Sequence, residues 1–281
     1  MLVIIGMITV LGAVIGGYLL EHGNLSVLFQ PVELLIIGGA AVGGFIIQSP
    51  SKVLSMVIKS VFKIFSARST SKKEFIDILA LLNEIFSKMR KEGLIAIESD
   101  IENPAQSPIF SKYPSIIKNK HALSYICDNL KVIISTNVSP HELDDVMEYE
   151  IETHHKQSMI PAHTVTKVAD ALPGLGIVAA VLGVVLTMGK ISEPPEILGE
   201  SIAAALVGTF LGVLLCYGFV GPIATNMEHA AEEDMICFQV IKIALVSFVG
   251  GAAPQIAVEF ARRVIPSDAK PSFNELEEAL R

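Results

Sequence analysis

Long uncharged runs dominate the pattern of hydrophobic and polar positions along this chain of 281 residues. Four of them approach or exceed the roughly 20 residues that a helix needs to cross the hydrocarbon core of a membrane. They cover residues 1–20, 34–51, 171–189 and 201–226. The pattern therefore predicts four transmembrane helices. The first run has neither the basic start nor the small-residue cleavage site of a signal peptide, so we expect it to remain as a span.

A fifth uncharged run, residues 243–258, is shorter and contains Gly250, Gly251 and Pro254. Charged residues lie close to it on both sides. We therefore expect a buried or interfacial helix here and no fifth span.

Lysine and arginine mark the two sides of the membrane, because short loops that are rich in them stay in the cytoplasm. Residues 21–33 contain none, whereas residues 52–167 contain fifteen and residues 223–281 contain five. We expect both termini to be cytoplasmic. The predicted layout is two spans joined by a short periplasmic loop, a cytoplasmic helical domain, two further spans and a cytoplasmic helical tail: residues 1–51, 52–170, 171–226 and 227–281.

Between the two pairs of spans, the chain shows the periodicity of amphipathic helices. Apolar residues recur at helical spacing through residues 75–89, with Ser71 and Glu74 as a capping box before them and Gly93 as a stop behind them. Residues 123–133 repeat the pattern. With no strand alternation of useful length, the sequence predicts an all-α, polytopic membrane protein with four transmembrane helices and a helical cytoplasmic domain.

A third cytoplasmic helix has a well-marked start. Ser139 supplies an N-cap, Pro140 is suited to the first helical position, and Glu142 completes the capping pair. Pro161 falls inside the following pattern, where it predicts a kink or a second helix start. A capping box at residues 272–275 opens a short helix in the tail.

The composition agrees with a membrane protein: 51% of residues are hydrophobic, 18% are charged and the mean hydropathy is +0.56. The net charge of −8 and the lack of a basic stripe argue against nucleic-acid binding. Cys127, Cys216 and Cys237 are too scattered for a disulfide framework or a thiolate metal site. No HExxH pattern, phosphate-binding loop or GxSxG elbow occurs, so we expect no enzyme activity, no metal and no cofactor.

The four uncharged runs contain no Asp, Glu, Lys, Arg or His, although ion transporters usually place such a side chain at membrane depth. We therefore expect a partner to supply any ion-binding group. Small and polar residues share one face of the third span and one face of the fourth, which lets another helix approach closely. These residues are Pro173, Gly176, Ala180 and Thr187, and Ala205, Thr209, Gly212 and Cys216.

Thr209 and Thr187 are the polar side chains best placed for an ion path, and Gly176 shares the face of Thr187. Each hydroxyl could equally bond to the carbonyl four residues back in its own helix. Pro173 and Pro222 each remove a backbone donor and free a carbonyl, which either serves water or a partner or only marks a helix end.

Opposite charges flank the stop at Gly93, with basic residues within 88–92 and acidic residues within 98–102. Such a segment is either a solvated helix end or a two-signed surface that orients a partner.

Distinctive motifs run along nearly the whole chain. The most specific are LPGLGIVAAVLGVV at 172–185, LVGTFLGVLLCYGFVGPIAT at 206–225 and PSFNELEE at 271–278, supported by QPVELLIIGGA at 30–40 and DIENP at 100–104. In these motifs the chain resembles the MotA/TolQ/ExbB proton channel family, and within it the stator subunits of the bacterial flagellar motor.

The resemblance implies a place in the bacterial inner membrane and a pentamer around a dimer of MotB, a single-span partner whose membrane aspartate binds the coupling ion. Rotation of the pentamer would drive the rotor switch protein FliG. The third and fourth spans would line the ion path. There, Pro173 and Pro222 match the family's conformational-coupling positions and Thr209 matches its channel-facing threonine.

The same resemblance places the rotor contact at Arg90, Glu98 and Glu150. Sodium-driven relatives carry a threonine where this chain has Ala180, so we expect protons as the coupling ion in preference to sodium. Two other interpretations stay open. One is an energiser of the ExbB or TolQ type, which has three spans and drives a periplasm-spanning partner; the other is a non-conducting membrane scaffold.

Overall fold

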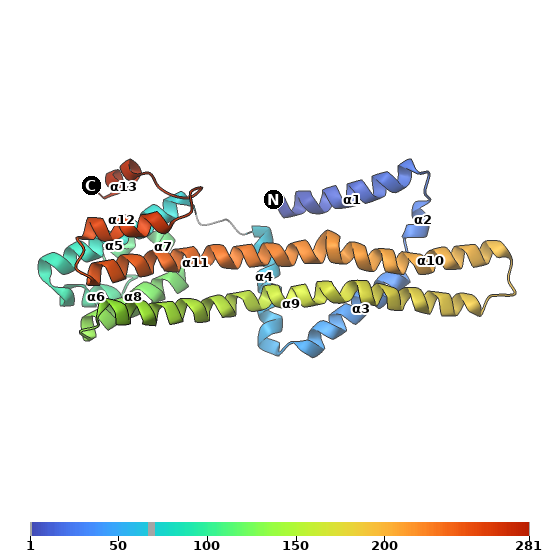
Figure 1. The fold of residues 1–281 in the computed structure, drawn as a ribbon, viewed down its shortest axis with the longest axis horizontal. Helices are drawn as coiled ribbons and strands as arrows, with labels where there is room; N and C mark the ends of the chain where they lie inside the picture. The colour runs from blue at the N-terminus through green and yellow to red at the C-terminus, as the bar shows by residue number, and fades with distance from the viewer. Residues whose placement is uncertain (1, 67–70, 281) are drawn as a thin grey trace. The chain divides into compact units, whose positions relative to one another are not determined.

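The computed structural model describes residues 2–66 and 71–280, and among them it contains helices and no β-strand (Figure 1). The prediction of an all-α fold is confirmed. The α-helices are α1 (Leu2–Leu20), α2 (Leu25–Leu28), α3 (Pro31–Gln48), α4 (Ser51–Ser66), α5 (Lys72–Glu92), α6 (Glu98–Glu102), α7 (Pro114–Lys118), α8 (Lys120–Ser135), α9 (Pro140–Met188), α10 (Pro195–Leu214), α11 (Gly221–Val249), α12 (Pro254–Val264) and α13 (Phe273–Ala279). Two short 3₁₀ helices, η1 (Leu94–Ile97) and η2 (Phe110–Lys112), and a π-helix, η3 (Leu215–Val220), complete the set.

Within residues 2–66 and 71–280, four helical stretches are long and apolar enough to cross a membrane, as the hydrophobic runs predict. They are Leu2–Leu20, Leu25–Gln48, Pro140–Met188 and Pro195–Val249. The expected membrane borders at residues 170 and 226 fall inside the continuous helices α9 and α11.

The chain forms two compact units, and α9 and α11 each contribute to both. We call residues 1–67 and 158–230 the membrane unit, and residues 68–157 and 231–281 the globular unit.

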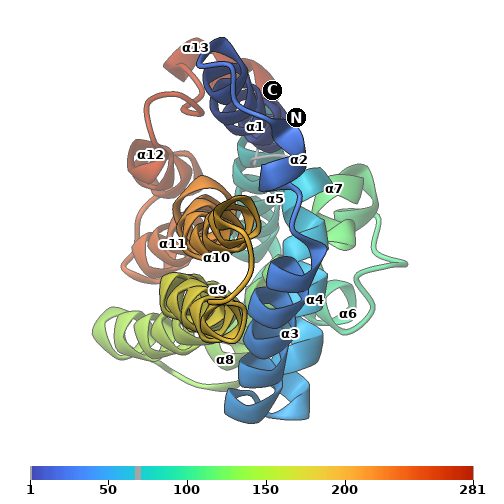
Figure 2. The ribbon, with the colours of Figure 1, turned by 90° about the vertical axis from the view of Figure 1, so that its right-hand side faces the viewer.

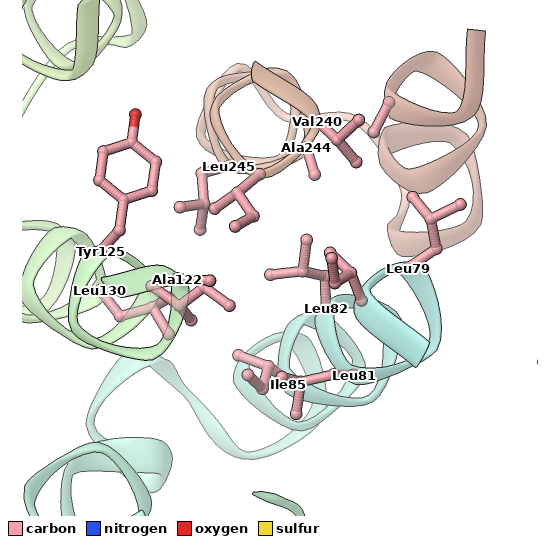
Figure 3. Close-up of a cluster of buried hydrophobic side chains, with 14 of the residues drawn as sticks. Leu79, Leu81, Leu82, Ile85, Ala122, Tyr125, Leu130, Val240, Ala244 and Leu245 are labelled. Atoms are coloured by element: carbon pink, nitrogen blue, oxygen red, sulfur yellow. The ribbon is translucent and has the colours of Figure 1, made fainter. Parts of the chain in front are cut away.

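The globular unit has a core of large aliphatic and aromatic side chains from α5, α8, α11 and α12 (Figure 3). Leu82 and Leu245 are fully buried there, and the ring of Phe86 stacks on that of Phe248 at 4.3 Å between centroids. The fifth uncharged run contributes to this core, because Leu245 of α11 and Val258 of α12 are both fully buried. The expected burial is confirmed, but the run is not one helix, because α11 ends at Val249 and α12 begins at Pro254.

The membrane unit is packed differently. Its buried clusters are small and rich in alanine, with Ile37, Ala169 and Ala179 among their members, and α1 has no buried residue. Figure 2 shows α3 beside the membrane parts of α9 and α10. The exposed apolar surface of the membrane unit, including that of α1, fits contact with lipid or with other chains.

The helix signals in the sequence are largely confirmed. Ser71 and Glu74 form the capping box of α5, and Gly93 ends that helix with φ +94°, which favours glycine. The hydroxyl of Ser139 accepts from the backbone of Glu142 at 3.3 Å at the start of α9. A second helix start at Pro161 is wrong, because α9 runs unbroken through that residue.

Candidate functional site

The membrane parts of α9 and α10 approach so closely that only glycine fits at their crossing. A Cβ added to Gly176 would sit 2.8 Å from the carbonyl oxygen of Gly208 and 3.0 Å from the Cα of Gly212. A Cβ added to Gly212 would sit 2.6 Å from the carbonyl oxygen of Leu172. Backbone therefore packs on backbone, the arrangement that small residues permit between membrane helices. Gly176, one of the residues that the sequence suggests for the ion path, therefore faces α10.

The same crossing continues further along the two helices. A Cβ on Gly183 would meet the Cβ of Ala205 at 2.7 Å, and a Cβ on Gly208 would lie 3.1 Å from the backbone nitrogen of Ala180. Ala180, the residue that bears on the choice of ion, therefore lies where α9 and α10 meet.

The two candidate threonines behave differently. The hydroxyl of Thr187 is buried and donates to the carbonyl oxygen of Gly183 at 2.8 Å, within its own helix. Thr209 is half-buried, and its hydroxyl makes no hydrogen bond with any residue that the structure describes. Of the two, Thr209 is the side chain whose hydroxyl is free to contact an ion or a partner.

Pro222 lies beside an irregular turn of the fourth span. The π-helix η3 widens the backbone over Leu215–Val220, directly before α11 begins at Gly221. A Cβ on Gly221 would sit 2.8 Å from the carbonyl oxygen of Cys216, so this turn also requires glycine. Single π-turns interrupt α-helices frequently at functional sites, and here one adjoins a proline that cannot donate a backbone hydrogen bond.

A pocket of about 560 Å³ opens at this turn, between α9 and the α10–α11 segment. Its lining includes Pro222 and Ala169 together with polar side chains such as Thr166, Asp170 and Asn226. Ala169 lies four residues before Pro173, so its carbonyl lacks the donor that α9 would otherwise supply. The two candidate prolines, Pro173 and Pro222, thus both affect the backbone at one pocket.

The sequence interpretation missed Glu33. The uncharged runs place it in the loop before the second span. That assignment is wrong, because α3 starts at Pro31 and Glu33 belongs to its first turn. Proline at the first helical position followed by an acid in the first turn was the available signal.

Arg90 and Glu98 are exposed on either side of the α5–η1 junction. Neither forms an ion pair with a described residue. Their neighbours Lys88 and Asp100 are instead joined at 2.8 Å, and Asp100, which is only 4% exposed, also accepts from the Ser107 hydroxyl at 2.6 Å. The charged segment thus contains one pair that holds the loop, and exposed charges of both signs, Arg90 and Glu98 among them, that are open to a partner.

Two apolar side chains lie between these open charges. Leu94 and Ile95 of η1 are 45% and 70% exposed. An apolar tip with a charged rim is typical of a protein contact surface.

Glu150 differs from Arg90 and Glu98. It lies on α9, and its carboxylate accepts a hydrogen bond from the amide of Asn129 on α8 at 3.3 Å. The protein surface that removes water from one side of this carboxyl raises its pKa above the ordinary value. Glu150 is exposed, as Arg90 and Glu98 are, but its carboxylate is already bonded to Asn129.

Three other titratable side chains, those of His154, Cys127 and Cys237, pack inside the globular unit. His154 packs on Phe238 and His121, and burial, followed by the neighbouring His121 charge, lowers the pKa of its imidazole. Burial raises the pKa of Cys127 to about 11 and that of Cys237 to about 12. In the part of the chain that the structure describes, no three His, Cys, Asp or Glu residues are grouped so that they could hold a metal.

Comparison with known proteins adds to this geometry. Residues 4–93 match the family described as Motility protein A N-terminal, and residues 117–238 match the MotA/TolQ/ExbB proton channel family. Motility protein A of Salmonella typhimurium is 43% identical to the chain over 281 residues, which are 100% of this chain and 95% of the relative.

Two solved structures have a similar fold. The MotAB structure of C. jejuni gives a TM-score of 0.78 at 20% identity and covers 96% of this chain and 98% of that one. The flagellar MotAB stator complex from Bacillus subtilis gives a TM-score of 0.74 at 22% identity and covers 94% and 96%.

Proposed function

The chain belongs to the MotA/TolQ/ExbB proton channel family, and from this premise we propose that it is a stator subunit of the bacterial flagellar motor. Together with MotB it couples proton flow across the inner membrane to torque on the rotor, and it is not an enzyme. The observation that carries the proposal is the glycine crossing of α9 and α10 with the pocket at Pro222, in a chain similar over its full length to a motility protein.

The coupling follows from how charge changes helix packing. Protonation of the MotB aspartate removes a charge that is costly in a low-dielectric path. The preferred packing against α9 and α10 then changes, and the ring moves by one subunit. A proton that falls through 100 mV releases about 2.3 kcal/mol, which exceeds thermal energy several times. Thr209 has the free hydroxyl for contact with the path, and Pro173 and Pro222 let the backbone at the pocket adjust.

The rotor contact in this proposal is the surface formed by Arg90, Leu94, Ile95 and Glu98. Its charges are open to solvent and lie on both sides of an apolar tip. Opposite charges on FliG would orient the contact, and the apolar tip would supply contact area. Glu150 has a supporting role, since its carboxylate is engaged with Asn129.

Assembly as a pentamer around a MotB dimer, with both termini in the cytoplasm, is also part of the proposal. Open glycine surfaces support such assembly, because a Cβ added to Gly12, Gly16, Gly39 or Gly43 would meet nothing within 4 Å. These faces are free for a neighbouring subunit or for lipid. Four spans, not three, disfavour an energiser of the ExbB or TolQ type.

Protons are the proposed coupling ion. At the crossing of α9 and α10 this chain has Ala180, whose methyl group cannot replace a ligand from the water shell of sodium. No metal or organic cofactor is part of the mechanism.

The test is swimming speed in a host that lacks its own stator and receives this chain with its cognate MotB. In sodium-free medium we expect swimming that collapses when a proton uncoupler is added. Swimming that requires sodium would contradict the choice of ion. No swimming, despite membrane insertion and pairing with MotB, would contradict the stator function and favour a scaffold.

The rotor surface has a separate test. Reversal of charge in Arg90→Glu should slow rotation under load, because it places like charges at the contact, and should leave proton flux nearly unchanged. Lys118→Glu, at an exposed position in α7, is the matched control. Equal speeds of both variants under load would contradict this assignment.

A further inference from the structure

Glu33 is the one carboxylate that the structure buries inside a membrane stretch among the described residues. It is only 8% exposed, and its Oε2 atom is buried without a hydrogen-bond partner. A carboxylate in the first turn of a helix is normally solvated, so its burial here needs an explanation.

The crevice that holds this carboxyl is formed by glycine on two different helices. A Cβ on Gly208 of α10 would come within 3.2 Å of Oε2 of Glu33, and a Cβ on Gly183 of α9 would come within 3.7 Å of Oε1. Side chains at either position would occupy space beside the carboxyl. The group therefore lies at the α9–α10 crossing itself, next to the residues that precede Thr209 and contact Ala180.

Among the described residues, no charged side chain pairs with the Glu33 carboxylate, and only the N-terminal end of α3 itself offers it partial positive charge. α2 has no charged residue, and the acids of α10, Glu196 and Glu200, are exposed in its first turns. On the membrane part of α9 the charged residue nearest to this crevice is Asp170, which lies more than three helical turns before Gly183. Lys190 follows the end of α9, and its ammonium group bonds to the Ser201 hydroxyl at 3.4 Å.

An ionised carboxylate without a partner in such surroundings is strongly disfavoured, so the group that fits this crevice is the neutral acid. Oε2 has no hydrogen-bond partner among the described residues in the closed crossing, so ionisation there is favoured only when the crossing opens to water or to a donor. The protonation state of Glu33 and the closure of α9 on α10 are therefore linked.

We infer that Glu33 is a proton-binding site of this chain, occupied while α9 and α10 are closed and emptied when they separate. This inference rests on the proposed stator function. On opening, the O–H bond of the acid breaks, its proton passes to water in the path, and a carboxylate remains. Uptake of a proton from water re-forms the O–H bond and allows closure. The cycle needs no group besides water.

The experiment uses the full chain with its cognate MotB and compares Glu33→Gln with Glu21→Gln. Glutamine has nearly the shape of the neutral acid but cannot lose a proton, so α9 and α10 should close normally. Co-purification with MotB should be retained, and swimming speed should fall roughly tenfold or more. Glu21 is an exposed acid in the loop after α1, and its variant should swim like the wild type.

Two further measurements test whether Glu33 binds a proton if the Glu33→Gln variant does not assemble with MotB. Glu33→Asp keeps a titratable acid and should swim faster than Glu33→Gln. Infrared spectra of the wild-type complex in lipid should contain the band of a protonated carboxyl that Glu33→Asp shifts.

Wild-type speed in Glu33→Gln, or no advantage of Glu33→Asp over Glu33→Gln, would overturn the inference while leaving the stator function intact. A wild-type complex that drives no swimming would instead show that the proposed function has failed.

Discussion

The two units of this chain achieve helix packing by opposite means. The globular unit buries large side chains such as Leu82, Phe86 and Leu245, and its stability comes from removal of apolar surface from water. The membrane unit leaves much of its apolar surface exposed and brings helices together through glycine at the α9–α10 crossing. The comparison teaches that side-chain volume holds the first unit together, whereas the absence of side chains permits the second.

The largest expected effect is loss of volume in the globular unit. Phe86→Ala removes a fully buried ring that stacks on Phe248 and should cost about 3–5 kcal/mol of unfolding free energy. Denaturant unfolding of the detergent-solubilised complex, followed by near-ultraviolet dichroism, measures it. Ile177→Ala, at a 55% exposed position of α9, is the control, and equal losses in both variants would break the comparison.

The next effect is gain of volume in the membrane unit. Gly176→Val places a branched side chain against the backbone of Gly208 and Gly212, and such overpacking costs about 1–3 kcal/mol. We expect wider separation of α9 and α10 and loss of swimming. Gly174→Ala is matched, because a Cβ there meets nothing within 4 Å. Normal swimming of Gly176→Val would show that this crossing is not as tight as its geometry indicates.

A smaller loss of stability is expected where charged contacts, not side-chain volume, hold a loop in place. Asp100→Asn weakens the contacts with Lys88 and Ser107, and loss of a partially buried charged bond costs about 1–3 kcal/mol. The loop that carries Glu98 should become more mobile, with faster amide hydrogen exchange. Glu102→Gln, at an exposed position of α6, should leave exchange unchanged; if Asp100→Asn does so as well, the pair does not hold the loop.

The smallest effect concerns pH. Because the pKa of His154 is lowered in the folded protein, the unfolded chain binds this proton more readily. The stability contributed by neutral His154 is complete above the unfolded pKa of about 6.5 and decreases as the pH falls below it. His154→Phe keeps an aromatic contact with Phe238 and should reduce the loss of thermal stability in acid. His141→Gln, at an exposed site, should not. Identical acid sensitivity of both variants would exclude His154 as the source.

The sequence was a good guide wherever local chemistry decides the structure. Ser71, Glu74 and Gly93 bound α5 as expected, since capping depends on residues a few positions apart. The four spans followed from hydropathy alone.

Features set by contacts between helices were harder to predict. Gly183 lies seven residues after Gly176 and so on the same face, yet only the structure shows that both meet α10. Pro161 remains inside α9 because the helix tolerates a missing donor there. Glu33 falls outside the predicted second span because a criterion of uncharged runs excludes every charged residue at a span's edge. The π-helix η3 has no sequence signal that we recognise.

All three cysteines, Cys127, Cys216 and Cys237, are buried, and the raised pKa values of Cys127 and Cys237 keep those thiols protonated at neutral pH. Maleimides and other thiol reagents should therefore react slowly with the native chain. A single cysteine placed at an exposed site such as position 90 or 98 could then carry a fluorophore, a spin label or a cross-linker without prior removal of the natural ones. The chain is in this respect already prepared for site-directed labelling of the surface around Arg90 and Glu98.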